Sequence, residues 1–242
     1  MPQNQFVGGV ARGYDLAAPE MYDPALLDLT ADFLAVEACG GSALEFGVGT
    51  GRIALPLAER SVPVHGVDIS ADMIEQLRQK PGAEAIATTV GDFAETVVAG
   101  SFSLVYVVYN SISNLLEQAE WVHCFRNAAR HLGPGGRFVI ELWVPDLRRF
   151  PHGAVALPFD VSPTHVGFDT IDVATQRGES NHYFLGDGRV SRFVSPYRYG
   201  WPAELDLMAQ IAGMTLRDRW ADWDRSPFTS ESGKHISVWE RP

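Results

Sequence analysis

Apolar residues follow two alternating patterns over the first 150 positions of the chain. The pair Asp23-Pro24 is typical of a helix start, and apolar side chains then repeat at helical spacing until Gly40-Gly41. Further helices are predicted over 53–60, 70–80 and 121–132. Between the helices lie short, wholly apolar stretches, which predict strands at 42–46, 62–67, 85–90, 103–109 and 137–143. Such strands, separated by helices, indicate a parallel sheet covered on both faces.

The pattern changes near Pro151, where proline, glycine and aromatic residues become frequent and the helical period disappears until Ala203. Antiparallel strands are predicted over 155–200, with a hairpin turn at Gly186-Asp187-Gly188. A last helix over 203–214 and strands at 215–223 and 235–240 follow. We therefore expect three parts. They are an α/β core with an N-terminal helical cap, an inserted β lid, and a segment that completes the core sheet, over 1–150, 151–200 and 201–242.

The net charge of the chain disfavours some classes of binding partner. Its 242 residues carry 30 Asp and Glu against 19 Lys and Arg, a formal net charge of −11. This disfavours nucleic acids and anionic membrane surfaces as partners. No signal-peptide core is visible, no apolar run is long enough to span a bilayer, and Cys39 and Cys124 are expected to be buried thiols. A cytoplasmic protein, monomeric or homodimeric, is the expectation.

The segment Glu45–Arg52 carries the strongest chemical signal, because its glycines lie between a predicted strand and a predicted helix. Parallel sheets bind ligands beyond the carboxyl ends of their strands, where a glycine turn lets the backbone approach a nucleotide. A dinucleotide fingerprint is G-x-G-x-x-G, but its last position here is Arg52, whose long side chain opposes close helix–strand packing. The G-x-G-x-G spacing suits S-adenosylmethionine better. A plain tight turn is the alternative.

Two acids follow the next predicted strands. Asp68 ends the second strand, 21 residues after Gly47, where a carboxylate can accept both hydroxyls of a ribose. Asp92 follows the third strand, where an acid can accept from an adenine amino group while Phe93 covers the ring. The structural alternatives are a helix cap or dipole partner for Asp68 and an ordinary turn acid for Asp92.

Taken together, these residues resemble the class I S-adenosylmethionine-dependent methyltransferases. The resemblance covers about residues 10–150 and rests on the segments 45–52, 67–70, 91–93, 106–111 and 132–136. Tyr14-Asp15, the β-rich insertion and the terminal hairpin are similar to the branch that methylates small molecules, including actinobacterial sugar-amine and antibiotic-tailoring enzymes.

The resemblance implies a Rossmann-like, doubly wound sheet of seven strands. The sheet is mostly parallel with the last strand antiparallel, and a small antiparallel β insertion follows the fifth strand. It implies S-adenosylmethionine as cofactor and S-adenosylhomocysteine as product. No metal is expected, because no acid stands at Tyr109 or Asn110, where catechol-type enzymes begin a divalent-metal site. The implied cofactor-binding residues are Tyr14, Tyr22, Glu45, Gly47, Gly49, Gly51, Asp68, Ile69, Met73, Asp92, Phe93 and Tyr109.

The acceptor side is less specified. Tyr14 is the one candidate catalytic residue, and the candidate substrate contacts are Asn110, Asn114, Trp143, Tyr197 and Tyr199. Packing is the alternative for each of these aromatic residues. The chain lacks the Asn/Asp-Pro-Pro-Tyr of amide and nucleic-acid methyltransferases, and Asn114 stands where sugar-amine relatives can have a histidine. His165, His182 and His235 are candidate general bases.

The expected function is transfer of a methyl group to oxygen or nitrogen of a small molecule, a specialised metabolite. Since the sulfonium already carries an activated methyl group, the enzyme mainly positions donor and acceptor, and no fixed base can be read from the chain. Two alternatives stay open. One is an S-adenosylmethionine-binding protein that does not methylate, and the other is an NAD(P)-dependent oxidoreductase.

Overall fold

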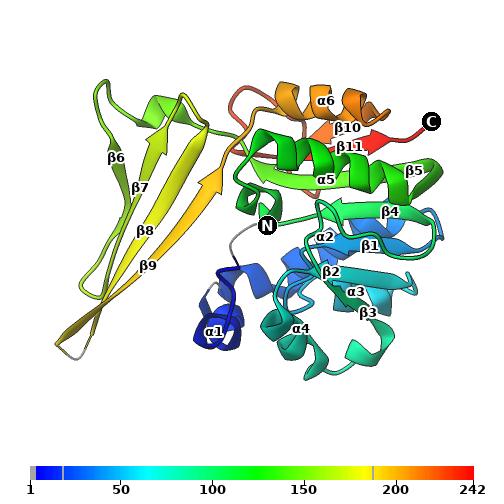
Figure 1. Ribbon diagram of the computed structural model, residues 1–242, viewed down its shortest axis with the longest axis horizontal. Coiled ribbons are helices and arrows are strands. Elements are labelled where there is room, and N and C mark those ends of the chain that lie inside the picture. The colour runs from blue at the N-terminus through cyan, green and yellow to red at the C-terminus, as the bar shows by residue number, and fades with distance from the viewer. Residues whose placement is uncertain (1–3, 18, 187) are drawn as a thin grey trace.

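The computed structural model describes residues 4–17, 19–186 and 188–242. Two sheets and the helices around the larger one make up the fold (Figure 1). In chain order the elements are α1 (Gly9–Ala17), η1 (Pro19–Tyr22), α2 (Pro24–Glu37), β1 (Ala43–Phe46), α3 (Ala54–Glu59), β2 (Val64–Asp68), α4 (Ala71–Arg78), η2 (Ala83–Ala85), β3 (Ala87–Val90), β4 (Phe102–Val107), η3 (Ser111–Asn114), α5 (Gln118–His131), β5 (Leu132–Trp143), η4 (Leu147–Arg149), β6 (Ala156–Val161), β7 (His165–Asp172), β8 (Arg177–Gly186), β9 (Arg189–Arg198), α6 (Pro202–Ile211), β10 (Thr215–Trp220) and β11 (Lys234–Glu240).

The larger sheet has seven strands in the order β10-β11-β5-β4-β1-β2-β3. Strands β1 to β5 are parallel, and β11 is antiparallel to both β5 and β10. The predicted fold class is therefore confirmed, including the antiparallel last strand. The chain order reverses at β1, whose neighbours are β4 and β2, and a sheet of this type binds ligands at such a switch point.

Helices cover both faces of this sheet because successive strand residues point to opposite faces. In β4, Val105 and Val107 pack in the same apolar cluster as residues of α5 and α6. Leu104 and Tyr106 belong to the other cluster, together with residues of α2, α3 and α4. The strands are thus buried on both sides, which explains why they read as continuous apolar runs.

Predicted helix caps are present. The Asp23 side chain accepts hydrogen bonds from the backbone N–H groups of Ala25 and Leu26, with Pro24 at the first helical position. Ser70 accepts from the N–H of Met73 at the start of α4. The described helices include none that is long and apolar enough to cross a membrane.

The second sheet is formed by β6, β7, β8 and β9 in sequential antiparallel order, as the sequence predicts for this region. In Figure 1 it extends to the left of the larger sheet, and α1 lies to the right of its lower end. The predicted hairpin turn joins β8 and β9, but its central residue Asp187 lies outside the described residues. The three-part division at residues 150 and 200 stays a prediction.

Three expectations are wrong in detail. β5 begins at Leu132 rather than at residue 137, and α5 ends at His131, because Leu132 pairs with Phe102. The region 83–85 is a short 3-10 helix, so β3 begins only at Ala87. Cys39 is exposed rather than buried, although Cys124 is buried as expected.

Candidate active site

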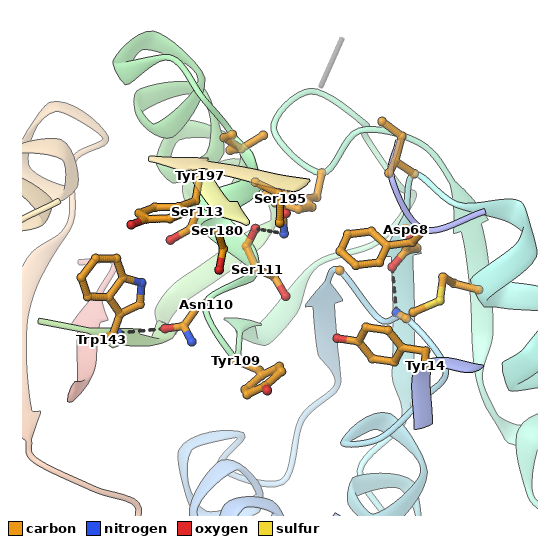
Figure 2. Close-up of a pocket in the computed structure, with 18 of the residues that line it drawn as sticks. Tyr14, Asp68, Tyr109, Asn110, Ser111, Ser113, Trp143, Ser180, Ser195 and Tyr197 are labelled. Carbon is orange, nitrogen blue, oxygen red and sulfur yellow. Dashed lines mark hydrogen bonds between the residues drawn. The ribbon is translucent and has the colours of Figure 1, made fainter. Parts of the chain in front are cut away.

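A cavity of about 590 Å³ lies at the carboxyl ends of the parallel strands. Its lining comes from the N-terminal segment, from the loops after β1 to β5, and from one face of the second sheet. Figure 2 shows Tyr14 and Asp68 on one side of the cavity, across from Trp143, Ser180 and Tyr197. The topology thus brings together residues that are up to 191 positions apart, from Phe6 to Tyr197.

The glycine loop has two functions. Gly47 and Gly49 line the cavity with positive φ angles of 80° and 54°. A Cβ on Gly47 would lie 3.2 Å from Ser111 Cβ, so the backbone there can approach a ligand only without a side chain. Gly51 differs, because it lies away from the cavity and its Cβ would lie 2.2 Å from Leu77 Cδ1. Glycine is needed at position 51 because a side chain there would collide with Leu77 of α4. The position of Gly51 therefore does not support the predicted cofactor contact.

Asp68 lies where it can serve both as a cap at the start of α4 and as a contact of a bound ribose, the two alternatives that its sequence position leaves open. Its Oδ2 accepts from the Gly49 N–H at 2.8 Å and its Oδ1 from the Ser70 N–H at 2.8 Å, so it fastens the glycine loop to the start of α4. The side chain also lines the cavity, and burial raises its pKa above the ordinary aspartate value. Each oxygen keeps a free lone-pair direction for a ligand hydroxyl.

Asp92, Phe93, Ile69 and Met73 line the same half of the cavity. Asp92 Oδ1 accepts from the Ala94 N–H at 2.9 Å, so it also stabilises its own turn. Burial raises the pKa of Asp92. The Phe93 ring stacks on Phe46 with centroids 5.7 Å apart, and Phe93 also lines the cavity.

The N-terminal segment is held to the glycine loop by Asp15. Its carboxylate accepts from the hydroxyls of Tyr22 at 2.5 Å and Thr50 at 2.6 Å, and it forms an ion pair with Lys80 at 2.5 Å. Tyr22 therefore points at Asp15 and Thr50 and does not line the cavity, contrary to the contact predicted for it. Tyr14, one position earlier than Asp15, does line it, and burial raises the pKa of its hydroxyl to about 12.

Glu45 lies beneath the glycine loop, next to a small cavity of about 30 Å³ rather than the large one. Its carboxyl group is buried, and the Tyr106 hydroxyl donates to Oε2 at 2.9 Å. Burial raises the pKa of Glu45 to about 8, and the Tyr106 hydrogen bond and Arg52 oppose this only in part. Glu45 thus lies outside the large cavity, and its contact with the cofactor stays a prediction.

The ends of β4 and β5 are fastened to each other. Tyr109 and Asn110 both adopt the left-handed conformation, with φ angles of 51° and 60°, which is uncommon for residues other than glycine. The Tyr109 N–H donates to Glu141, and Asn110 Oδ1 accepts from the Trp143 N–H at 2.8 Å (Figure 2). These bonds hold the strained turn so that Tyr109, Asn110 and Trp143 all face the cavity.

The remaining wall is supplied by the second sheet and η3. Of the predicted substrate contacts there, Asn114 and Tyr197 line the cavity, whereas Tyr199 is 1% exposed and packs against Trp143. Sequence reasoning missed several cavity residues as site residues, namely Phe6, Ser111, Ser113, Leu115, Arg149, Asp169, Ser180 and Ser195. For Ser180 and Ser195 the alternation of side chains along a strand could have predicted this, since Ser180 and His182 of β8 and Phe193, Ser195 and Tyr197 of β9 all face the cavity.

The three candidate histidines lie at different places relative to the cavity. His182 lines the cavity, and His165 lies behind it at 3.1 Å between ring nitrogens. His235 is fully buried in β11, its Nδ1 lies 2.8 Å from Ser237 Oγ, and burial lowers its pKa to about 3. It belongs to the core and not to the site. Within the described ranges 4–17, 19–186 and 188–242, no group of three His, Cys, Asp or Glu side chains can hold a metal ion.

Known proteins share both the sequence and the shape of this chain. Residues 43–136 match the methyltransferase domain family. The CcbJ methyltransferase from Streptomyces caelestis is 35% identical, with a TM-score of 0.82 and 90% of each chain covered. The cypemycin N-terminal methyltransferase from a Streptomyces species is 28% identical over 84% of each chain. The fold of CalS10, an amino pentose methyltransferase from Micromonospora echinaspora crystallised with S-adenosylmethionine, is similar at 20% identity and a TM-score of 0.71, over 99% of each chain.

A doubly wound sheet with a glycine loop and a carboxylate after its second strand defines a nucleotide-type binding site. With the matches to relatives over most of its length, the chain belongs to the class I S-adenosylmethionine-dependent methyltransferases. Its cofactor is S-adenosylmethionine, and the oxidoreductase alternative is excluded.

Proposed function

We propose that this methyltransferase acts on nitrogen or oxygen of a small molecule, a specialised metabolite, without a metal ion. The observation that carries the proposal is the division of the 590 Å³ cavity into two halves. One half is formed by the glycine loop and the acids after β2 and β3, and the other by Trp143 and the second sheet. A cavity of about 590 Å³ has the size of a small-molecule site, which typically spans about 300–1,000 Å³.

The residues of the first half fit the methyl donor. Gly47 and Gly49 give a backbone cradle that a Cβ would fill, and Asp68 offers two oxygens to ribose hydroxyls. Asp92 and Phe93 offer a hydrogen-bond acceptor and an aromatic ring to the adenine. When bound, S-adenosylmethionine supplies a methyl group on a sulfonium, and the task of these residues is to hold it in line with the acceptor.

Relatives support a small acceptor. Besides those already described, the dTDP-3-amino-3,6-dideoxy-alpha-D-glucopyranose N,N-dimethyltransferase of Streptomyces fradiae is 30% identical over 59% of this chain and 56% of its own length. Their names indicate amines on sugars and on a peptide terminus as acceptors. An amine or hydroxyl of an antibiotic or its precursor is therefore the class of acceptor that we propose here.

The function is tested with S-adenosylmethionine carrying a deuterated methyl group. The purified enzyme is incubated with amino sugars, their nucleotide esters, small peptides and phenols, and products are detected by mass spectrometry. A labelled product on nitrogen or oxygen is expected. Turnover only on carbon or on macromolecules would contradict the proposal, and intact cofactor throughout would favour binding without transfer.

Cofactor binding is expected in the micromolar range for both S-adenosylmethionine and S-adenosylhomocysteine, about −8 kcal/mol at 1 μM. The reason is the preformed cradle at Gly47 and Gly49 together with the Asp68 carboxylate. Isothermal titration calorimetry measures this directly, with NADH as the negative control. Saturable NADH binding without a response to S-adenosylmethionine would contradict it.

Turnover is expected to survive chelation. The described residues hold no acid and histidine group suited to a metal ion. The rate with EDTA should equal the rate without it. Activity that EDTA removes and magnesium restores would show a metal requirement.

The second sheet is expected to serve the acceptor more than the cofactor. Tyr197 packs edge-on against Trp143 with centroids 5.8 Å apart, and Tyr14 faces the cavity from α1. Tyr14→Phe and Tyr197→Ala should therefore reduce methyl transfer more than they weaken S-adenosylhomocysteine binding. Tyr183→Ala is the matched control, because Tyr183 stacks on Phe168 on the opposite face of the same sheet. Equal losses in kinetics and calorimetry would assign these tyrosines to cofactor binding or to the fold.

A further inference from the structure

Four polar side chains form a continuous chain along the cavity-facing side of the second sheet. Asp160 Oδ2 lies 2.5 Å from His165 Nδ1, and His165 Nε2 lies 3.1 Å from His182 Nδ1. His182 Nε2 in turn lies 3.2 Å from Ser180 Oγ. Ser180 and His182 line the cavity, whereas the Asp160 side chain is 45% exposed at the far end. The chain therefore connects the cavity with solvent.

The backbone is built to hold the two imidazoles together. His165 pairs with Phe184 and Gly167 pairs with His182 in the β7–β8 register, so the two histidines are diagonal neighbours on one face. Their rings are stacked with centroids 5.2 Å apart. A Cβ on Gly167 would lie 2.2 Å from the Phe159 ring and 3.0 Å from His165 Cε1. Glycine at this position thus leaves the space that the aromatic stack occupies.

The hydrogen bonds determine the tautomers of both histidines. A carboxylate accepts only, so Asp160 requires the proton of His165 to be on Nδ1. His165 Nε2 is then an acceptor and requires the proton of His182 to be on Nδ1. His182 Nε2 is left with a free lone pair at the cavity wall. Ser180 Oγ–H can occupy this lone pair, or it can turn to Asp169, its other neighbour.

We propose that His182 is the general base for the methyl acceptor and that Asp160 and His165 position it and carry its proton away. The inference rests on the proposed function, since it requires an acceptor with an N–H or O–H group in this half of the cavity. The acceptor atom forms a bond to the methyl carbon, the bond from this carbon to the sulfonium sulfur breaks, and its electron pair stays on the sulfur, which leaves as S-adenosylhomocysteine. The acceptor atom loses one proton to His182 Nε2. The Nδ1 proton of His182 passes to His165 Nε2, and the positive charge ends on His165 beside Asp160.

The surroundings of His182 favour a neutral resting ring. Burial is the main cause that lowers the pKa of His182, and His165 lowers it further, whereas Asp169 acts in the opposite direction. The charged and titratable groups near it are Asp169 and His165 on β7, Asp160 on β6 and Arg149 from η4. Phe193 on β9 covers another side, with ring centroids 5.9 Å apart.

Kinetics with the acceptor identified by the deuterated-methyl assay form the first test. His182→Gln should lower kcat at least about 100-fold while the affinity for S-adenosylhomocysteine changes by less than about threefold. Asp160→Asn should keep the tautomers, because the amide oxygen still accepts, but it removes the charge that stabilises the protonated pair. The acidic limb of its kcat–pH profile should move to lower pH by about one unit. His123→Gln, an exposed histidine outside the cavity, is the matched control.

Nuclear magnetic resonance of ¹⁵N-histidine-labelled protein bound to S-adenosylhomocysteine is the second test, and it needs no acceptor. His165 and His182 should both carry their proton on Nδ1 when neutral, and His165→Phe should abolish this preference at His182. A neutral His182 that carries its proton on Nε2 would overturn the proposed proton relay from His182 through His165 to Asp160. A His182→Gln variant with kcat within about threefold of the wild type would overturn the proposal that His182 is the general base. Absence of transfer to every acceptor would contradict the proposed function instead, and the spectra would still decide the relay.

Discussion

Asp68→Ala should weaken binding of S-adenosylhomocysteine roughly ten- to hundredfold. The substitution removes a carboxylate that lines the cavity and that we propose binds the ribose, and hydrogen bonds to a charged group contribute about 1.5–3 kcal/mol. It also releases the N–H groups of Gly49 and Ser70, so the glycine loop loses its connection to α4. Both effects act in the same direction on affinity, and calorimetry measures their sum.

A second aspartate separates the two effects. Asp23 caps α2 through the N–H groups of Ala25 and Leu26, much as Asp68 accepts from backbone donors, but it lies outside the cavity. Asp23→Ala should cost about 1 kcal/mol of stability and leave cofactor affinity unchanged. If Asp68→Ala behaves in the same way, with lower stability and normal binding, Asp68 is a structural cap and not a ribose ligand.

Glu45→Gln should make the protein more stable, and increasingly so as the pH rises. The folded-state pKa of Glu45 is about 8 against an ordinary value of 4.5. A group with a raised folded pKa contributes fully below the unfolded pKa, and this contribution is lost as the pH rises toward the folded pKa. The wild type should therefore lose stability between these two values, and the neutral glutamine should not. The difference should reach about 3 kcal/mol near pH 7, as an order of magnitude.

Denaturant unfolding of both proteins over a series of pH values measures this difference. Glu37→Gln is the matched control, because Glu37 is also buried but forms ion pairs with Arg137 at 2.7 Å and Arg225 at 3.1 Å. Removing that charge should destabilise the protein, since two cations lose their partner. A stability difference for Glu45→Gln that does not vary with pH would mean that Glu45 is ionised in the folded protein.

Most of the residues that the sequence predicts for the cofactor line the cavity, because their positions are set by local features of the chain. Gly47, Gly49, Asp68 and Asp92 lie at the end of a strand or within three residues after it, and parallel strands bring their carboxyl ends to one edge. Tyr22, Glu45 and Gly51 are exceptions, because none of them lines the large cavity. Their surroundings depend on residues distant in the sequence: Asp15 and Thr50 contact Tyr22, Tyr106 contacts Glu45, and Leu77 packs against Gly51.

The sequence by itself determined the fold class, the glycine loop and the family, since hydrophobic periodicity and strand-end residues are properties of short segments. Only the tertiary structure decided what the acceptor half contains. The relay from Asp160 to Ser180 spans three strands, and the pairing of Gly167 with His182 determines its register. A shift of one residue would turn His182 to the opposite face. Such a register is set by long-range packing of the whole sheet, which no local pattern of residues specifies.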